Sequence, residues 1–224
     1  MRISVIIPTL DEALGLAQTL RVVSGLQCSA PIELIVADGG SRDGTVALAR
    51  QLGAHVVIGA QGRAQQLNRG AAAASGDVLL FLHADTELPA NGLTRVEAAV
   101  SSGALWGRFD VRIQGRARML RIVAFMMNWR SRVTGIATGD QAMFMTRGAF
   151  DAVGGYPDQA LMEDIAMSRR LKRRGAPVCL RGPATTSGRR WETRGIWRTI
   201  LLMWRLRWAY WRGTSPDQLA QRYR

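Results

Sequence analysis

The chain of 224 residues is 47% hydrophobic and 21% charged, a composition that excludes a disordered or low-complexity protein. Its length fits one domain of ordinary size, with or without an appendage, and can bury a core without help from disulfides or metal. Thirty basic residues, all Arg except Lys172, outnumber 17 acidic ones and give a formal charge of +13. Most of this excess lies in residues 108–224, which indicates a local surface for the phosphates of nucleotides, nucleic acids or anionic lipids.

The cysteines and the N-terminus bound the cellular location. Cys28 and Cys179 are far apart and outside any C-x-x-C motif, which excludes a disulfide framework or a zinc knuckle as the organising principle. We expect two buried thiols in a reducing cytosol. The first apolar run, residues 3–7, is too short for a secretory signal, and no run of about 18 uncharged apolar residues predicts a membrane-spanning helix. The expected location is cytoplasmic.

The first hundred residues alternate β-branched runs with helical patterns, an order that predicts an α/β fold with a parallel sheet and right-handed crossovers. Strands are expected over residues 3–7, 33–37, 55–58 and 78–82, and helices over 12–26, 43–52 and 64–74. The second half is less regular. There, strands are expected over 104–113, 140–146 and 178–180, helices over 119–129, 147–153, 165–174 and 194–212, and a polar tail from 215 onward.

Polar, largely acidic clusters follow three of the predicted strands, at residues 8–12, 38–45 and 83–85. Because ligands bind outside the carboxyl ends of parallel strands, we expect one site at this rim. Glu12 and Asp38 can accept hydrogen bonds from a base or a ribose there. Helix capping explains Glu12 equally well, whereas the glycines after Asp38 favour close approach of a ligand.

The phosphate-binding motifs of common nucleotide sites are missing. No G-x-G-x-x-G or Walker A loop follows the first strand, which argues against a nicotinamide site or a P-loop. Arg63 lies near the expected start of a helix, where the guanidinium and the helix dipole both favour a phosphate, and Gln65, Gln66 and Asn68 add polar groups. A merely solvated Arg63 is an equal alternative.

Asp85 follows the apolar run 79–82 and offers a hard oxygen ligand for Mg²⁺ or Mn²⁺ shared with a diphosphate. His83 lies on the same side of an extended chain and could be a weaker ligand or a phosphate contact. In the alternative interpretation, Asp85 is a turn residue beside a capping Thr86.

A second acidic pair, Glu163-Asp164, starts a helix whose surroundings are basic. The cationic field of residues 169–181 would keep one carboxylate ionised, as a general base requires. Capping of the helix explains the pair equally well. Residues 187–192 combine guanidinium groups with an aromatic ring and could clamp a diphosphate, stack on a base or face an anionic lipid.

The helix expected over residues 194–212 places four tryptophans and a leucine on one face, with an arginine stripe beside it. The apolar face holds Trp197, Leu201, Trp204, Trp208 and Trp211, and the stripe holds Arg198, Arg205 and Arg212. This pattern is typical of a helix that lies on a membrane surface, and residues 119–129 could extend that surface. A helix that packs its Trp face on the domain needs the same pattern. The membrane interpretation would add a peripheral location on the inner face of the cell membrane.

Taken together, these motifs resemble the family 2 glycosyltransferases with the GT-A fold, and most closely a small bacterial subgroup of generic transferases. The similar segments are residues 5–12, 37–45, 83–85, 139–142 and 163–164. The resemblance implies a GT-A domain, with a Rossmann-like, mostly parallel sheet flanked by helices, over residues 1–191. Within it, residues 1–100 would form the nucleotide-binding half and 101–191 the acceptor half. Residues 192–224 would form a Trp/Arg-rich, amphipathic helical extension.

The resemblance also implies an inverting transfer of a sugar from a nucleotide diphosphate sugar, with a UDP-sugar expected first, to an acceptor hydroxyl. The cofactor would be Mn²⁺ or Mg²⁺ at Asp85, and the catalytic residues Asp164, as general base, and Glu163. The donor side would comprise Pro8, Thr9, Glu12, Asp38, Gly39, Arg63, Asn68, His83, Ala84 and Asp85. The acceptor side would comprise Gly139, Asp140, Gln141, Arg189, Arg190 and Trp191.

The sequence departs from the family pattern at two positions. Gly39 stands where the family has a second Asp, and His83 stands where the metal motif begins with Asp. The long membrane spans of processive synthases are missing as well, so we expect transfer of a single sugar, with a lipid-linked acceptor as one option.

Two other function classes compete with this interpretation. A sugar-nucleotide nucleotidyltransferase usually carries a basic, Gly-rich loop after the first strand, but residues 8–12 contain no base. An Arg-rich RNA- or membrane-binding module fits the net charge, yet carboxylates at the rim would repel phosphate without a metal. We therefore expect no nucleic-acid partner, and leave a homo-oligomer open.

Overall fold

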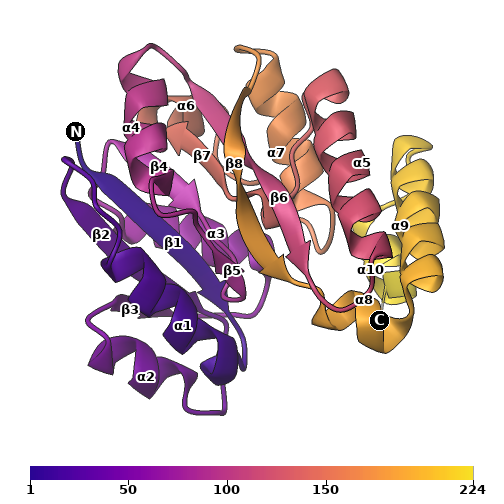
Figure 1. Ribbon diagram of the computed structural model, residues 1–224, viewed down its shortest axis with the longest axis horizontal. Coiled ribbons are helices and arrows are strands. Elements are labelled where there is room, and N and C mark those ends of the chain that lie inside the picture. Colours follow the sequence, from indigo (N-terminus) through magenta and orange to yellow (C-terminus); the bar gives the residue numbers. More distant parts are fainter. Residues whose placement is uncertain (224) are drawn as a thin grey trace.

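A computed structural model describes residues 1–223 as one eight-stranded sheet with helices on both faces (Figure 1). The strands are β1 (Ile3–Thr9), β2 (Ile32–Asp38), β3 (His55–Ile58), β4 (Val78–Phe81), β5 (Thr86–Glu87), β6 (Trp106–Gln114), β7 (Met143–Thr146) and β8 (Val178–Ser187). The helices are α1 (Ala13–Ser24), α2 (Thr45–Gln51), α3 (Arg63–Ala73), α4 (Gly92–Ser101), α5 (Met119–Thr134), α6 (Arg147–Ala152), α7 (Glu163–Lys172), α8 (Arg189–Arg194), α9 (Ile196–Trp211) and α10 (Pro216–Tyr223), with a 3-10 turn η1 at Gly139–Gln141.

The sheet has the strand order β3-β2-β1-β4-β7-β6-β8-β5, and its first four strands are parallel, as the alternating pattern predicts. β1 consists mostly of apolar residues because helices cover the sheet on both of its faces. Val5 packs toward the α1 side of the sheet and Ile6 toward the α3 side. Gly70 lets α3 approach closely, since a Cβ there would lie 2.4 Å from the Ile6 side chain.

Two strands in the second half of the sheet differ from their predictions. β7 pairs antiparallel with both β4 and β6, and it begins at Met143 because residues 139–141 close a 3-10 turn. β8 extends to Ser187, well beyond the expected 178–180, because it pairs along β6 up to Gln114 and adds β5 at the sheet edge. The helix α4 was not predicted.

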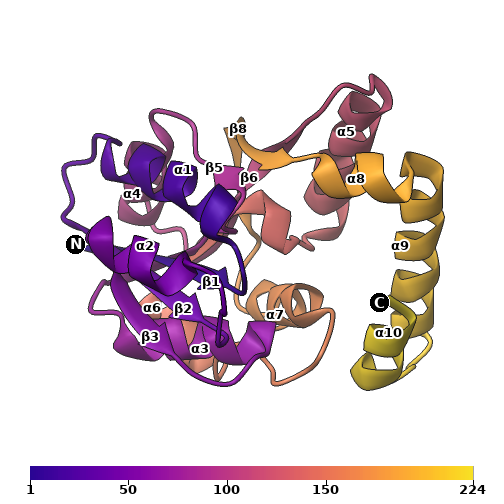
Figure 2. The same ribbon diagram turned by 90° about the horizontal axis from the view of Figure 1, so that it is seen from below.

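The C-terminal extension is helical to Tyr223, so the expected polar tail is wrong: Leu219 is fully buried and docks α10. Figure 2 shows α9 along one edge of the molecule, with α10 folded back on the side toward α7. α9 buries Leu206 and Ala209, whereas its Trp face points outward. The alternative in which this face packs on the domain is therefore not observed.

Two further features of the described chain bear on location. Cys28 and Cys179 are free and half-buried. No helix within residues 1–223 has the length and apolar character needed to cross a bilayer.

Candidate active site

The floor of the site is formed where β1 and β2 end side by side. The Thr9 hydroxyl donates to an Asp38 carboxylate oxygen at 3.0 Å, and the N–H groups of Gly40 and Ser41 each donate to the other oxygen at 2.8 Å. Burial opposes ionisation of Asp38, but these hydrogen bonds, with one from the Ser41 hydroxyl, outweigh it and lower the pKa of the carboxyl. Asp38 is fully buried, so its first role is to fix the loop after β2.

Gln66 joins the two strand ends from α3. Its amide donates to the carbonyl oxygens of Thr9 at 2.7 Å and Ala37 at 3.0 Å. A Cβ at Gly39 would lie 3.1 Å from the same amide, so the glycine in place of the family's second Asp lets Gln66 fill this space. Gln66 was expected only as one of the polar groups near Arg63, and the sequence gives no signal of its bonds to the two strand ends.

Asn68 and Ala84, which were expected to contact the donor, make hydrogen bonds within the protein instead. The Asn68 amide donates to the Tyr156 carbonyl and accepts from the Tyr156 N–H, each at 2.8 Å, which fastens the loop after α6 to α3. Ala84 is buried, and its carbonyl accepts from the Thr19 hydroxyl at 2.7 Å. This bond holds the loop of residues 83–85 against α1. Pro8 lies half-buried next to the floor.

Charged side chains from four separate segments converge above the floor. Burial and repulsion by Asp85 raise the pKa of Glu12, while Arg189, Arg63 and His83 oppose that shift. The Glu12 side chain makes no capping hydrogen bond to α1, so the helix-cap alternative is not realised. Asp85, Arg189, Arg63 and His83 therefore all lie within electrostatic reach of Glu12 at the predicted rim.

His83 connects the rim to the turn η1. Its Nδ1 lies 3.2 Å from the carboxylate of Asp140. Burial would raise the pKa of Asp140, but the bond to His83 and the charges of Arg63 and Arg190 outweigh it and lower that pKa. The imidazole packs so closely on Gly139 that a Cβ there would lie 2.3 Å from Nε2. Gly139 thus serves the site by leaving room for His83.

The acidic pair lies at the start of α7, after Met162 in the left-handed conformation. The Asp164 carboxylate accepts from the Gly139 N–H at 3.0 Å and from the Ile165 N–H at 2.7 Å. Glu163 is buried and lies 3.7 Å from the Arg63 guanidinium. Burial and repulsion by Asp164, only partly offset by Arg63, raise the pKa of Glu163 to about 7.

Two arginines that sequence reasoning missed face the acidic pair. Burial lowers the pKa of Arg130 to about 10, helped by the nearby Arg207 and opposed by Asp164. Burial also lowers the pKa of Arg207, against the attraction of Asp164 and Asp140. Two nitrogens of the Arg130 guanidinium are buried without a hydrogen-bond partner in the described chain. The sequence offers no signal for this pair, because it forms only when α9 docks beside α5.

The remaining acceptor-side residues divide into two groups. Arg189 is exposed at the rim, and Arg190 stacks on the Tyr223 ring at 4.1 Å. Gln141 is fully buried and completes a capping box with Thr138, and Trp191 packs in the apolar cluster between α5 and α9. The structure thus gives Gln141 and Trp191 packing roles.

The carboxylates at the rim fit a divalent cation only together with a ligand. Within residues 1–223 no group of three or more His, Cys, Asp or Glu side chains is arranged to hold a metal ion. Asp85 accepts only a long hydrogen bond of 3.4 Å, from Thr86, so its oxygens are available, and its repulsion of Glu12 would be relieved by a cation. The other ligands would have to be oxygens of a bound phosphate or water.

Comparisons with known proteins identify the family of this chain. Residues 4–154 match the family described as Glycosyl transferase family 2. A PGL/p-HBAD biosynthesis glycosyltransferase of Mycobacterium bovis is 34% identical over 169 residues, which cover 68% of this chain and 62% of that protein. An uncharacterized glycosyltransferase of Mycobacterium tuberculosis is 30% identical over 187 residues, 79% of this chain and 70% of that one. The chain therefore spans less than two thirds of the length of the first of these relatives.

Solved structures share the fold at lower identity. Staphylococcus aureus TarS, residues 1–349, is 15% identical with a TM-score of 0.67, over 84% of this chain and 61% of that one. The mannosyltransferase PcManGT from Pyrobaculum calidifontis, in complex with GDP-Man and Mn²⁺, is 20% identical with a TM-score of 0.67, over 99% of this chain and 68% of that one. These similarities confirm the expected GT-A type of fold.

Proposed function

Because this chain belongs to glycosyl transferase family 2, we propose that it is a glycosyltransferase that moves one sugar from a nucleotide diphosphate sugar to an acceptor hydroxyl, with inversion at the anomeric carbon. The observation that carries this proposal is the convergence of Glu12, Asp85 and Arg63 on one rim, with the Glu163-Asp164 pair beside Arg63. Carboxylates for a cation, an arginine for a phosphate and a candidate base then share one site.

The donor binds over the floor formed by β1 and β2, with its nucleoside near Thr9, Asp38 and Glu12. We assign a UDP-sugar first. Solved structures of TarS hold UDP-GlcNAc or UDP, whereas PcManGT holds GDP-Man, so GDP-sugars are the natural second choice. Arg63, at the start of α3, is exposed and can bind the diphosphate, and its pKa is raised because the nearby carboxylates of Glu163, Asp140 and Asp164 favour its charge.

Asp85 would hold Mn²⁺ or Mg²⁺ together with the donor's phosphate oxygens. PcManGT was solved with Mn²⁺, which fits a divalent cation in this kind of fold. When bound, the cation would neutralise charge on the leaving diphosphate. His83 lies beside this position, where its bond to Asp140 fixes the imidazole.

Asp164 is the general base of the proposed reaction. Two backbone N–H groups orient its carboxylate, and Arg63, Arg130 and Arg207 lie within electrostatic reach of it. As the acceptor oxygen forms its bond to the anomeric carbon, its proton passes to Asp164. The bond from that carbon to the diphosphate oxygen breaks, and the nucleoside diphosphate leaves with the electron pair.

The acceptor approaches from the side of Asp140, Arg189 and Arg190. A lipid-linked acceptor fits the exposed apolar face of α9. Arg190 lies on α8, and α9 follows α8 directly in the chain. We propose no nucleic-acid partner, because the carboxylates at the rim would repel its phosphates. We propose no nucleotidyltransferase reaction, because the loop after β1 contains no basic residue. Self-association of the chain stays open.

The test is transfer or hydrolysis of UDP- and GDP-sugars with Mn²⁺ by wild type and two variants, Asp85→Asn and Asp164→Asn. Each variant should lose at least about a hundredfold in kcat/KM, the usual contribution of a general base or a metal ligand. Asp151→Asn, an exposed carboxylate on α6, is the matched control and should keep wild-type activity. Absence of donor binding in wild type, or equal activity in all four proteins, would overturn the proposal.

A further inference from the structure

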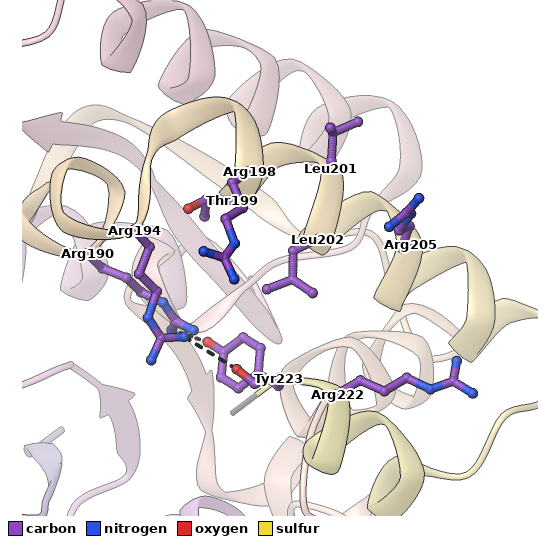
Figure 3. A pocket seen from close by; sticks show the side chains of 9 residues that line it. All are labelled: Arg190, Arg194, Arg198, Thr199, Leu201, Leu202, Arg205, Arg222 and Tyr223. Carbon is purple, nitrogen blue, oxygen red and sulfur yellow. Dashed lines mark hydrogen bonds between the residues drawn. The ribbon is translucent and has the colours of Figure 1, made fainter.

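Beside the proposed active site, helices α9 and α10 enclose a basic pocket that shares only Arg190 with the acceptor side of that site. The pocket has a volume of about 620 Å³ and lies between α8, α9 and α10 (Figure 3). Five arginines line it: Arg190, Arg194, Arg198, Arg205 and Arg222. No acidic residue is among the residues that line it. We refer to it as the arginine pocket.

The guanidinium groups of this pocket are largely without partners. Arg190 and Arg194 bond to Tyr223, but the side chains of Arg198, Arg205 and Arg222 make no hydrogen bond or ion pair with any residue in the described part of the chain. Gathering like charges costs free energy, which a bound anion with several oxygens would recover. The pocket therefore fits a phosphate group.

The apolar surface next to the pocket is exposed. The Trp face of α9, defined as Trp197, Leu201, Trp204, Trp208 and Trp211, is 57–70% exposed. Leu201 belongs to this face and also lines the arginine pocket. α5 packs beside α9 through a shared apolar cluster and exposes apolar side chains of its own, at Ile122, Phe125, Met126, Trp129 and Val133. Figure 1 shows the two helices at the same edge of the molecule.

We propose that the arginine pocket binds the phosphate headgroup of an anionic phospholipid while the Trp face of α9, extended by α5, enters the outer acyl region of the same bilayer. Tryptophan favours this depth of a membrane, and arginine pairs with lipid phosphates at its surface. The helices lie on the bilayer and do not cross it. The site is separate from the donor rim, so this proposal does not depend on sugar transfer.

Charge and apolar contact together favour an anionic bilayer over a second copy of the chain or RNA as the occupant of this surface. A second copy of the chain would bring an equal charge of +13 and the same arginines toward the first, which disfavours a dimer through this face. RNA would match the arginines, but the aliphatic side chains of Leu201, Ile122 and Val133 offer it no contact. An anionic membrane complements both halves of the surface.

The test is flotation of the full-length protein with vesicles of phosphatidylcholine alone or mixed with phosphatidylglycerol. We expect binding to the mixed vesicles, with a blue shift in tryptophan emission, and little binding to the neutral ones. The triple variant Arg194→Gln/Arg198→Gln/Arg205→Gln should bind the mixed vesicles about a hundredfold more weakly, as expected from three arginines at an anionic surface. Trp204→Ser/Trp208→Ser should lose binding and most of the blue shift.

The matched control is Arg21→Gln/Arg50→Gln/Arg173→Gln, which removes the same charge from exposed side chains outside the pocket. It should bind vesicles like wild type. Equal weakening in both triple variants, or wild-type binding to neutral vesicles, would overturn the pocket. A dimer that dissociates in the Trp variant, without vesicle binding by wild type, would assign the face to a second copy. Thermal unfolding and donor binding of every variant show whether the fold and the proposed active site are intact.

Discussion

At the scale of single residues, the site depends on Gly139 as much as on the charged groups. Its missing side chain leaves room for the His83 ring, so Gly139→Ala forces the imidazole or η1 to move. Overpacking of this kind costs about 1–3 kcal/mol of unfolding free energy. We expect a lower Tm and, because the Gly139 N–H orients Asp164, a lower kcat.

Gly148 provides the matched control for this substitution. It is an exposed residue of α6, and a Cβ added there would meet no described atom within 4 Å apart from its chain neighbours and the backbone of its own helix. Gly148→Ala should leave stability unchanged or raise it by up to about 1 kcal/mol, since alanine is the better helix former. Equal melting curves for the Gly139→Ala and Gly148→Ala proteins would show that the His83 contact is not tight.

The raised pKa of Glu163 makes stability depend on pH. The folded protein keeps this proton up to a pKa of about 7, whereas the unfolded chain releases it near the ordinary value of 4.5. The folded state therefore binds more protons between these values, and stability falls as pH rises through them, by up to about 3 kcal/mol. Glu163→Gln, which resembles the protonated acid, should have a Tm close to wild type near pH 5 and higher than wild type at pH 8.

The comparison needs only thermal melts of the two proteins across that pH range, because other titrating groups are common to both. A Tm difference that stays constant with pH would show that Glu163 is ionised throughout. The same variant also reports on the reaction: if Asp164 alone is the base, Glu163→Gln should retain far more activity than Asp164→Asn.

At the scale of elements, the sequence predicts a strand or helix correctly where the apolar pattern of that segment alone identifies it. The strands β1 to β4 are apolar runs between polar breaks, and the rim residues Glu12, Asp38 and Asp85 follow from where those strands end. The helix α4 is an exception, because Leu93, Val96 and Val100 have helical spacing and yet the helix was not predicted. The length of β8 was missed because Gly182 and Pro183 interrupt a strand that pairing with β6 nevertheless maintains.

Long-range packing explains what the sequence could not show at the site. Arg130 and Arg207 lie on different helices, and only the docking of α9 brings them near Asp164. Trp191, in contrast, was expected on the acceptor side but packs between α5 and α9. Tertiary contacts, which a single sequence does not reveal, decide both cases.

The docking of α10 gives a prediction for the C-terminal helices. Leu219 is fully buried against α9 and the start of α7, and truncation of a buried leucine typically costs about 2–5 kcal/mol. Because α10 packs mainly on α9, Leu219→Ala should release this helix locally. We expect amide exchange in residues 216–223 to become at least about tenfold faster, with the strands unchanged, as measured by hydrogen–deuterium exchange. Leu201→Ala, at an exposed position on α9, should leave the exchange of α10 as it is.

At the scale of the whole molecule, the sheet brings the two halves of the chain to one site. The loops after β1, β2 and β4 supply the donor side, and β7, which inserts antiparallel beside β4, leads from η1 and thereby places Asp140 next to His83. The acidic pair Glu163-Asp164 lies at the start of α7, and arginines on α8 and α9 lie near it. A ligand at the rim therefore touches both halves and should stabilise the fold as a whole.

This arrangement predicts that metal and nucleotide stabilise the protein together and not separately. The described chain offers no cluster of three metal-binding side chains, so Mn²⁺ alone should change the Tm little. With a nucleoside diphosphate to complete the coordination, binding at a hundredfold excess over Kd adds about 2.7 kcal/mol. For a domain of this size that corresponds to a rise in Tm of roughly 5–11 °C, measured by thermal shift with UDP and with GDP. In Asp85→Asn the joint effect should shrink to that of the nucleotide alone, while Asp151→Asn keeps it. A full shift with Mn²⁺ in the absence of nucleotide would instead mean that the protein holds the cation without the phosphate oxygens.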